Sequence, residues 1–304
     1  MKIVFAGSPE FAVPALERLA ATGKVVAVVT QPDKPAGRKK ILTPTPVKVR
    51  AQELGLPVYA FEKIKNEVAV LKELDADVMI TCAYGQLLTQ DVLNCFSGGV
   101  WNIHASLLPE FRGASPISSA ILAGKEYTGV TVMRTELSLD TGAMLLVKRC
   151  SAEGLTCGEL TSKLSVLGAE AAVETVELLE KGDVQTLIQD EEKATYCKKI
   201  KKADGKIDFA RSSRDIYRLI KAFSPEPAAY CLFNGGVFNV FDCEYAESVQ
   251  GNNGEVVRAD KKGITVKCGD GCITFTEVQP AGGKRMRAAD FVNGRKIKAG
   301  DVLD

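Results

Sequence analysis

An asparagine, a histidine and an aspartate are the residues of this sequence best suited to chemistry. His104 is the only histidine among 304 residues, and it follows Asn102 by two positions after a short apolar run at 99–101. Such a run is typical of a strand, and residues two apart on a strand point to the same face. Asp140 lies in a turn-like segment between two strand-like runs. We expect the three side chains to meet at the carboxyl edge of a sheet, where open α/β folds collect reactive groups.

Together these three side chains can move an acyl group onto an amine. In that reaction the amine loses a proton, the carbonyl oxygen becomes an anion, and the departing nitrogen gains a proton. An imidazole can carry protons, a nearby carboxylate fixes its tautomer, and an asparagine amide can donate to an oxyanion. Positioned proton transfer contributes about 10² to 10⁴-fold and one oxyanion donor about 10² to 10³-fold, so both contributions matter.

Four short motifs around these residues resemble the folate-dependent formyltransferase family. They are Asn102-Ile103-His104, Ser106-Leu107-Leu108-Pro109, Arg112-Gly113 and Leu139-Asp140-Thr141-Gly142. The resemblance runs from residue 2 to about 303 and implies that Asn102, His104 and Asp140 are catalytic. It also implies that 10-formyltetrahydrofolate donates the formyl group. The implied folate-binding residues are Ser106, Leu107, Leu108 and Pro109, with Tyr84, Gly85 and the segments 83–85 and 137–142.

Alternating apolar runs and short helical patterns predict a Rossmann-like, doubly wound and mainly parallel α/β sheet. The strands are expected at 2–6, 25–29, 78–83, 99–101, 129–134 and 143–147, and the helices at 14–22, 47–54, 68–74, 90–95 and 115–123. Thr156 and Glu159 have the spacing of a capping box that opens a long helix, whose apolar positions continue to Leu178. The catalytic domain is expected to occupy residues 1–188.

A smaller domain is expected at 209–304, after a basic linker at 189–208. Following a helix at 213–222, short strand-like runs are separated by turns such as Asn-Gly-Gly and Gly-Asp-Gly. These runs lie at 229–233, 237–241, 255–258, 264–266 and 272–275. The pattern predicts a small β-barrel, and the resemblance implies an OB-like barrel.

Lysine and arginine are concentrated in three stretches, although the chain carries a net charge of only +1. Residues 34–50 hold six basic residues and no acid, 193–218 hold nine against three, and 284–298 hold six against one. Such segregation suits a polyanion. The resemblance implies that the loop at 31–46 reaches the acceptor end of methionyl initiator tRNA. The expected tRNA contacts are Arg38, Lys39 and Lys40 in this loop and Lys201, Lys202 and Lys206 in the linker.

The sequence predicts a cytoplasmic protein without a metal or a membrane partner, and a monomer is expected. No cleavable signal pattern is present, and no apolar run is long enough to span a bilayer. Nine cysteines without a Cys-x-x-Cys pair suit a reducing compartment, and a single histidine argues against a zinc site.

Other functions fit the sequence less well or remain open. A dinucleotide-dependent oxidoreductase requires three glycines in the first turn, where Gly7 stands alone, and the nucleophile elbow of a serine hydrolase is missing. Formyl transfer to a small amine such as an amino sugar nucleotide, or hydrolysis of 10-formyltetrahydrofolate, would use the same three residues. A non-catalytic RNA-binding module also remains open.

Overall fold

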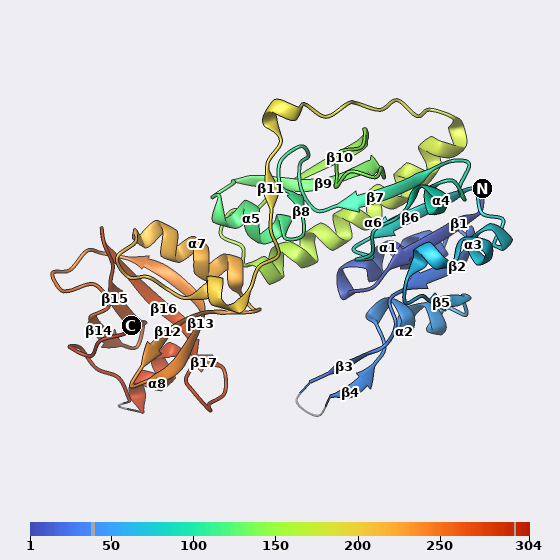
Figure 1. Ribbon diagram of the computed structural model, residues 1–304. Helices are drawn as coiled ribbons and strands as arrows, with labels where there is room; N and C mark the ends of the chain where they lie inside the picture. The colour runs from blue at the N-terminus through green and yellow to red at the C-terminus, as the bar shows by residue number, and fades with distance from the viewer. Residues whose placement is uncertain (38–39, 295) are drawn as a thin grey trace. The chain divides into compact units, whose positions relative to one another are not determined.

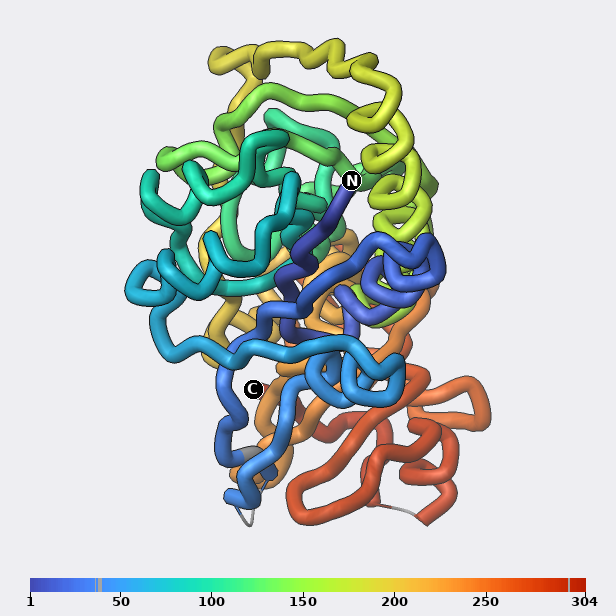
Figure 2. The backbone as a smooth tube through the Cα atoms, turned by 90° about the vertical axis from the view of Figure 1, so that its right-hand side faces the viewer, coloured from blue at the N-terminus to red at the C-terminus, as the bar shows by residue number. Residues whose placement is uncertain are grey.

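A computed structural model describes residues 1–37, 40–294 and 296–304 of the chain (Figure 1). The chain divides into two compact units. Unit 1 comprises Met1–Pro116, Tyr127–Cys150 and Thr161–Cys197, and unit 2 comprises Ile117–Glu126, Ser151–Leu160 and Lys198–Asp304. The smooth trace in Figure 2 follows the same path from a second direction. Each unit is described separately below.

Unit 1 is built on a seven-stranded, mainly parallel sheet, which confirms the predicted Rossmann-like class. The strand order is β10-β9-β7-β6-β1-β2-β5. The strands are β1 (Ile3–Gly7), β2 (Val25–Thr30), β5 (Val58–Ala60), β6 (Val78–Cys82), β7 (Val100–His104), β9 (Tyr127–Arg134) and β10 (Met144–Ser151). Neighbours from β5 to β7 pair in parallel, whereas β9 runs antiparallel to β7. The sheet therefore presents the carboxyl ends of β1, β6 and β7 at one edge.

Helices cover the sheet and connect its strands (Figure 1). In unit 1 they are η1 (Glu10–Ala12), α1 (Val13–Ala20), α2 (Pro46–Glu53), η2 (Ile64–Asn66), α3 (Val68–Glu73), α4 (Gln90–Leu93) and most of α6 (Cys157–Lys181). Nearly all of α5 (Pro116–Leu122) and the first residues of α6 belong to unit 2. The predicted capping box of α6 is confirmed, because Thr156 N donates to Glu159 Oε2 at 2.8 Å while Glu159 N donates to Thr156 Oγ1 at 3.3 Å.

The long helix α6 packs against one face of β7. A Cβ added to Gly168 of α6 would lie 3.1 Å from Cγ2 of Ile103, so the glycine allows close approach to that strand. Because neighbouring strand residues point to opposite faces, Ile103 faces α6 while Asn102 and His104 face away from it. The alternation of β7 thus places the two polar side chains on the face opposite the long helix.

Two short elements of unit 1 differ from the sequence prediction. The segment 31–46 was expected to be a loop, but it contains an antiparallel hairpin of β3 (Lys34–Ala36) and β4 (Ile41–Thr43). The strand β5 was also not expected. Three-residue strands show no measurable alternation, and a proline inside β3 disfavours a strand on sequence grounds.

Unit 2 contains an antiparallel sheet with the strand order β12-β13-β16-β15-β14, and β17 pairs with β16. The strands are β12 (Ala229–Phe233), β13 (Gly236–Ala246), β14 (Val256–Asp260), β15 (Gly263–Lys267), β16 (Cys272–Gln279) and β17 (Met286–Arg287), with helices η4 (Lys202–Gly205), α7 (Ser213–Phe223) and α8 (Ala288–Asn293).

The last residues of the chain close this sheet. Leu232 of the edge strand β12 exchanges two backbone hydrogen bonds with Asp304, at 2.6 and 3.0 Å. At the other edge, Leu303 N donates to Gly254 O and Val256 N donates to Asp301 O. Because one segment satisfies both edge strands, the sheet curls into the predicted small barrel.

Candidate active site

The imidazole of His104 and the carboxylate of Asp140 lie together, although 36 positions separate them in the sequence. His104 ends β7, and Asp140 lies in the loop 135–143 that joins β9 to β10. His104 Nδ1 is 3.7 Å from Asp140 Oδ2, and the two side chains are 7% and 12% exposed. The pair is therefore nearly buried, and it becomes an ion pair when the imidazole is protonated.

A backbone carbonyl fixes the orientation of the imidazole. His104 Nε2 lies 2.9 Å from the carbonyl oxygen of Phe111. Because a carbonyl only accepts, this nitrogen must carry a proton. The other nitrogen, Nδ1, is therefore the one that can take up or release a proton, and it faces Asp140.

The carboxylate of Asp140 is held by a main-chain donor. Its Oδ2 accepts a hydrogen bond of 2.7 Å from Gly113 N. Gly113 has a φ of 116°, and a Cβ at this position would clash with the carbonyl oxygen of Cys197. Asp140 itself has a φ of 55°, a left-handed conformation that aspartate tolerates better than most residues. The local backbone therefore requires glycine at 113 and suits aspartate at 140.

The amide of Asn102 is oriented by a threonine on the neighbouring strand. Thr81 of β6 pairs with Asn102 of β7, and Thr81 Oγ1 donates to Asn102 Oδ1 at 2.8 Å. No described residue accepts a hydrogen bond from Asn102 Nδ2. Since the amide oxygen is engaged, the NH₂ group is the part of Asn102 that remains to donate to a substrate.

The motif that follows His104 uses its polar groups in hydrogen bonds within its own loop and to the neighbouring strand β9. Ser106 Oγ donates to Glu110 O at 2.6 Å, and Leu108 N donates to Thr131 Oγ1 at 3.2 Å. Ser106 and Leu108 are buried, whereas Leu107 and Pro109 are half-buried. The hydrogen bonds therefore shape the loop, and Leu107 and Pro109 are its more accessible side chains.

The turn after β6 holds the other residues expected to bind folate, Tyr84 and Gly85. Gly85 has a φ of 81°, and the Tyr84 carbonyl accepts hydrogen bonds from Gln31 Nε2 at 2.9 Å and Ser8 Oγ at 3.3 Å. The Tyr84 ring is only 4% exposed and packs in the core beneath the sheet edge, where burial raises the pKa of its hydroxyl. The ring of Tyr84 therefore belongs to the core, and its carbonyl oxygen is engaged within the protein.

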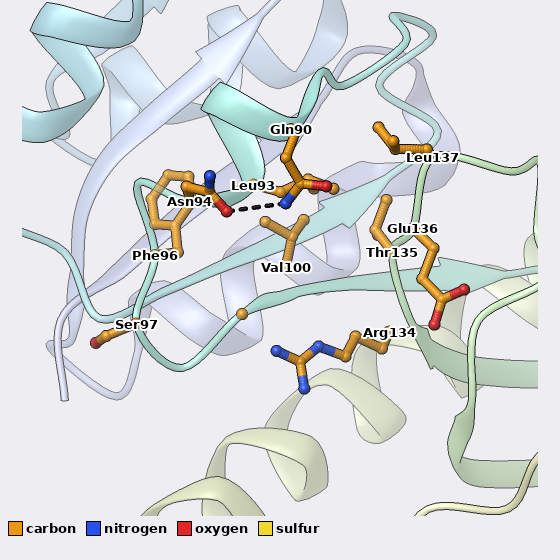
Figure 3. Close-up of a pocket in the computed structure, with 11 residues that line it drawn as sticks. Gln90, Leu93, Asn94, Phe96, Ser97, Val100, Arg134, Thr135, Glu136 and Leu137 are labelled. Atoms are coloured by element: carbon orange, nitrogen blue, oxygen red, sulfur yellow. Dashed lines mark hydrogen bonds between the residues drawn. The ribbon is translucent and has the colours of Figure 1, made fainter.

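A cavity of about 520 Å³ lies beside the loop that carries Asp140 (Figure 3). Leu93, Phe96, Val100 and Leu137 supply apolar surface. Polar groups come from Gln90, Asn94, Ser97, Arg134, Thr135 and Glu136. Val100 lies four residues before His104 on β7, so at about 3.3 Å per residue the two positions are about 13 Å apart along the strand. Leu137 belongs both to this cavity and to the segment expected to bind folate.

The basic residues expected to contact tRNA are only partly described. Lys40, Lys201, Lys202 and Lys206 are exposed, and none of these four forms an ion pair with another described residue. Arg38 and Lys39 lie outside the described residues.

Two residues at the site were missed by sequence reasoning, and a third had no role assigned. Thr81 orients Asn102, and a lone hydroxyl in an otherwise apolar strand was a signal that could have found it. Gln189 contacts the Asp140 loop, yet it stood in a stretch interpreted as a connector. Arg112 belongs to a quoted motif, but its partner Gln189 is 77 positions away. Among the described residues, no cluster of His, Cys, Asp or Glu is placed to hold a metal ion.

Comparisons with known proteins agree with this architecture. The family described as "Formyl transferase" matches residues 1–176, and "Formyl transferase, C-terminal domain" matches residues 199–296. A methionyl-tRNA formyltransferase of Bacillus velezensis is 42% identical over 99% of this chain and 97% of its own length. Its counterpart from Neisseria gonorrhoeae is 44% identical over 100% of both chains.

A solved structure shares the fold at lower identity. The N-formyltransferase from Helicobacter canadensis, in complex with folinic acid and dTDP-3-aminofucose, matches with a TM-score of 0.69 and 18% identity, covering 90% of this chain and 98% of that chain. The matches to both family descriptions and the full-length relatives lead to one conclusion. This chain belongs to the formyl transferase family.

Proposed function

We propose that this chain transfers the formyl group of 10-formyltetrahydrofolate to the amino group of methionyl initiator tRNA. The observation that carries the proposal is the 42% and 44% identity to two methionyl-tRNA formyltransferases over nearly the full length of each chain. The proximity of His104 and Asp140, with Asn102 on the same strand face, supports it because this reaction needs a proton carrier and an oxyanion donor.

The proposed mechanism follows from the orientation of the three side chains. The methionyl amine attacks the formyl carbon, and the carbonyl oxygen becomes an anion to which Asn102 Nδ2 donates. His104 Nδ1 takes the proton that the amine loses, while Asp140 stabilises the imidazolium. As the bond from the formyl carbon to N10 breaks, that proton goes to N10. The products are formylmethionyl-tRNA and tetrahydrofolate.

The domain roles are part of the same proposal. Residues 1–188 would carry out catalysis, while the linker at 189–208 and the barrel at 209–304 would contact tRNA through their lysines and arginines. We also propose that the protein is a monomer and that it works in the cytoplasm, where thiols are kept reduced. All nine cysteines are described, and none of them forms a disulfide. No helix in the described ranges is long and apolar enough to cross a bilayer.

Mass spectrometry of methionyl initiator tRNA after incubation with the protein and 10-formyltetrahydrofolate tests the reaction. The expected result is the gain of one formyl group on the methionine amine. Parallel reactions with an amino sugar nucleotide, and with no acceptor, separate the alternative acceptors. Formylation of the sugar alone, or release of formate without an acceptor, would contradict the proposal.

We place the pterin end of the folate in the cavity beside the Asp140 loop. Its apolar surface suits the flat ring, and its amides and hydroxyls suit the polar edges of the ring (Figure 3).

Replacing Leu137 with alanine is expected to raise the KM for 10-formyltetrahydrofolate by about 5- to 20-fold with little change in kcat. Leu137 is 64% exposed and lines the cavity, so its apolar area is covered only when a ligand binds. Steady-state kinetics at saturating tRNA measure the effect. Leu139→Ala is the matched control, because Leu139 is 53% exposed on the same loop but does not line the cavity. Equal increases in the KM of the two variants would contradict the proposal that folate binds in this cavity.

Replacing Arg38 with alanine is expected to weaken turnover of methionyl-tRNA while leaving folate binding nearly intact. Loss of one phosphate contact should lower the slope of log affinity for tRNA against log salt concentration by about 1. Arg50→Gln is the control from the same basic stretch, because Arg50 is already paired with Glu17 and Glu53. Equal loss of tRNA and folate binding in separate titrations of Arg38→Ala would refute this division of roles.

A further inference from the structure

Gln189 is a buried polar residue that makes four hydrogen bonds with Arg112, Asp140 and Gly142 at the edge of the candidate site, and its Nε2 lies at a longer 3.9 Å from Met133 Sδ. Its side chain lies after α6 and is only 4% exposed. Its Oε1 accepts from Arg112 Nε at 3.0 Å and Arg112 Nη2 at 2.9 Å. Its Nε2 donates to the carbonyl oxygens of Asp140 at 2.9 Å and Gly142 at 2.8 Å. The amide therefore uses both acceptor positions and both donor hydrogens.

The orientation of this amide follows from its partners. A guanidinium can only donate hydrogen bonds, and a backbone carbonyl can only accept them. A flipped amide would place its NH₂ group against Arg112 and its oxygen against two carbonyls, which would break all four hydrogen bonds. Only one orientation of Gln189 is compatible with this site.

Arg112 anchors the other side of Gln189. Its side chain is 0% exposed. Its guanidinium also donates to both carboxylate oxygens of Glu191, at 2.7 and 2.9 Å, and to Tyr196 Oη at 3.0 Å. The backbone of Arg112 belongs to β8 (Arg112–Gly113), which pairs with β11 (Tyr196–Cys197). Through Arg112, Gln189 is tied to the loop that follows His104.

The loop of Asp140 is also held by Gly113 N, which donates to Asp140 Oδ2, and by the hydrogen bond from Thr135 N to Val100 O. Glu136, Leu137, Ser138 and Leu139 are all exposed, and Asp140 has a left-handed backbone conformation. The two carbonyls held by Gln189 stand on either side of Thr141, directly next to the carboxylate that faces His104. A conformation that is intrinsically unfavourable is maintained only when its surroundings fix it.

We infer that Gln189 is a positioning residue that holds the Asp140 carboxylate at His104 for formyl transfer. The inference rests on the proposed function, because it assumes that Asp140 serves the reaction. Gln189 itself touches no reacting atom. It acts through the backbone of Asp140 and Gly142, and Arg112 fixes it in the one orientation that can do so.

The substitution Gln189→Glu keeps the contact with Arg112 but disrupts the contacts with the Asp140 loop. A carboxylate keeps an acceptor for Arg112, so the buried guanidinium remains paired, but it opposes the carbonyls of Asp140 and Gly142 with an oxygen. Misplacement of a catalytic group by about 1 Å can cost about 10²-fold, so kcat should fall by about 10- to 100-fold. The KM for tRNA should change by less than about threefold.

The matched control is Glu191→Gln. Glu191 binds the same guanidinium from the same segment but is 67% exposed and does not touch the Asp140 loop. This variant weakens the ion pair of Arg112 while leaving Gln189 intact. Its kcat should stay within about twofold of the unmodified enzyme, because the glutamine oxygen can still accept a hydrogen bond from the buried guanidinium while Gln189 keeps its own partners.

A double-mutant cycle with Asp140→Asn distinguishes positioning from a general structural role. If Gln189 acts through the Asp140 carboxylate, Gln189→Glu should lower kcat by less than about threefold when Asp140→Asn is already present. The same factor in both backgrounds, or an unchanged kcat of Gln189→Glu alone, overturns the inference. Thermal unfolding of each variant checks the fold, and Gln189→Met repeats the cycle should the charged variant fail to fold.

The cycle also separates this inference from the proposed function. A fully active Gln189→Glu beside a strongly impaired Asp140→Asn contradicts only the positioning role of Gln189. An Asp140→Asn variant as active as the unmodified enzyme contradicts the catalytic role of Asp140, and the positioning role falls with it.

Discussion

Replacing His104 with glutamine is expected to lower kcat for formyl transfer by about 10²- to 10⁴-fold, the range of positioned proton transfer. The glutamine amide nitrogen can reach the same position as Nε2 and keep the hydrogen bond to the Phe111 carbonyl. It cannot carry a proton between the amine and N10. The loss should therefore appear in single-turnover rates at saturating substrates, while folate binding by titration changes by less than about threefold.

Cys197→Ala is the control for a purely structural effect at the same carbonyl. Cys197 Sγ also lies within hydrogen-bonding distance of Phe111 O, at 3.5 Å. This variant should keep kcat within a few-fold of the unmodified enzyme. If Cys197→Ala loses as much activity as His104→Gln, the loop conformation and not proton transfer explains the loss.

The features predicted from sequence are those that depend on local periodicity. Asn102 and His104 share a face because strand alternation has a period of two, and β7 extends through both residues. The parallel sheet follows from apolar strands that alternate with helical patterns, such as Val78–Cys82. The capping box of α6 is equally local, since its two residues are three positions apart.

The features that sequence reasoning missed depend on contacts between distant segments. Gln189 meets Arg112 and Asp140 only because the segment after α6 returns to the loop beyond β7, and its polar surroundings in sequence suggested a connector. Tyr84 stays a residue proposed to bind folate, but the burial of its ring in the core is a feature that the local sequence pattern does not reveal. The closure of the barrel also depends on distant segments, because Asp304 bonds to Leu232 of the edge strand. Long-range packing decides each of these positions.

Replacing Asn102 with alanine is expected to lower kcat by about 10²- to 10³-fold, because it removes the proposed oxyanion donor from the same strand face as His104. Binding of both substrates should change little, since the interaction strengthens only as the carbonyl oxygen becomes an anion. Single-turnover kinetics beside equilibrium titration of each substrate measure the two effects separately.

The variant Thr81→Val is expected to have a smaller effect than Asn102→Ala, because it disturbs only the orientation of the Asn102 amide. It retains the amide but removes the hydroxyl that holds its oxygen, at a cost of about one hydrogen bond, so kcat should fall by about fivefold and not several hundredfold. Combining it with Asn102→Ala should add almost nothing, because the threonine then has no amide to orient. Multiplicative losses in the double variant, or an Asn102→Ala variant defective only in KM, would mean that Asn102 binds substrate and does not stabilise the transition state.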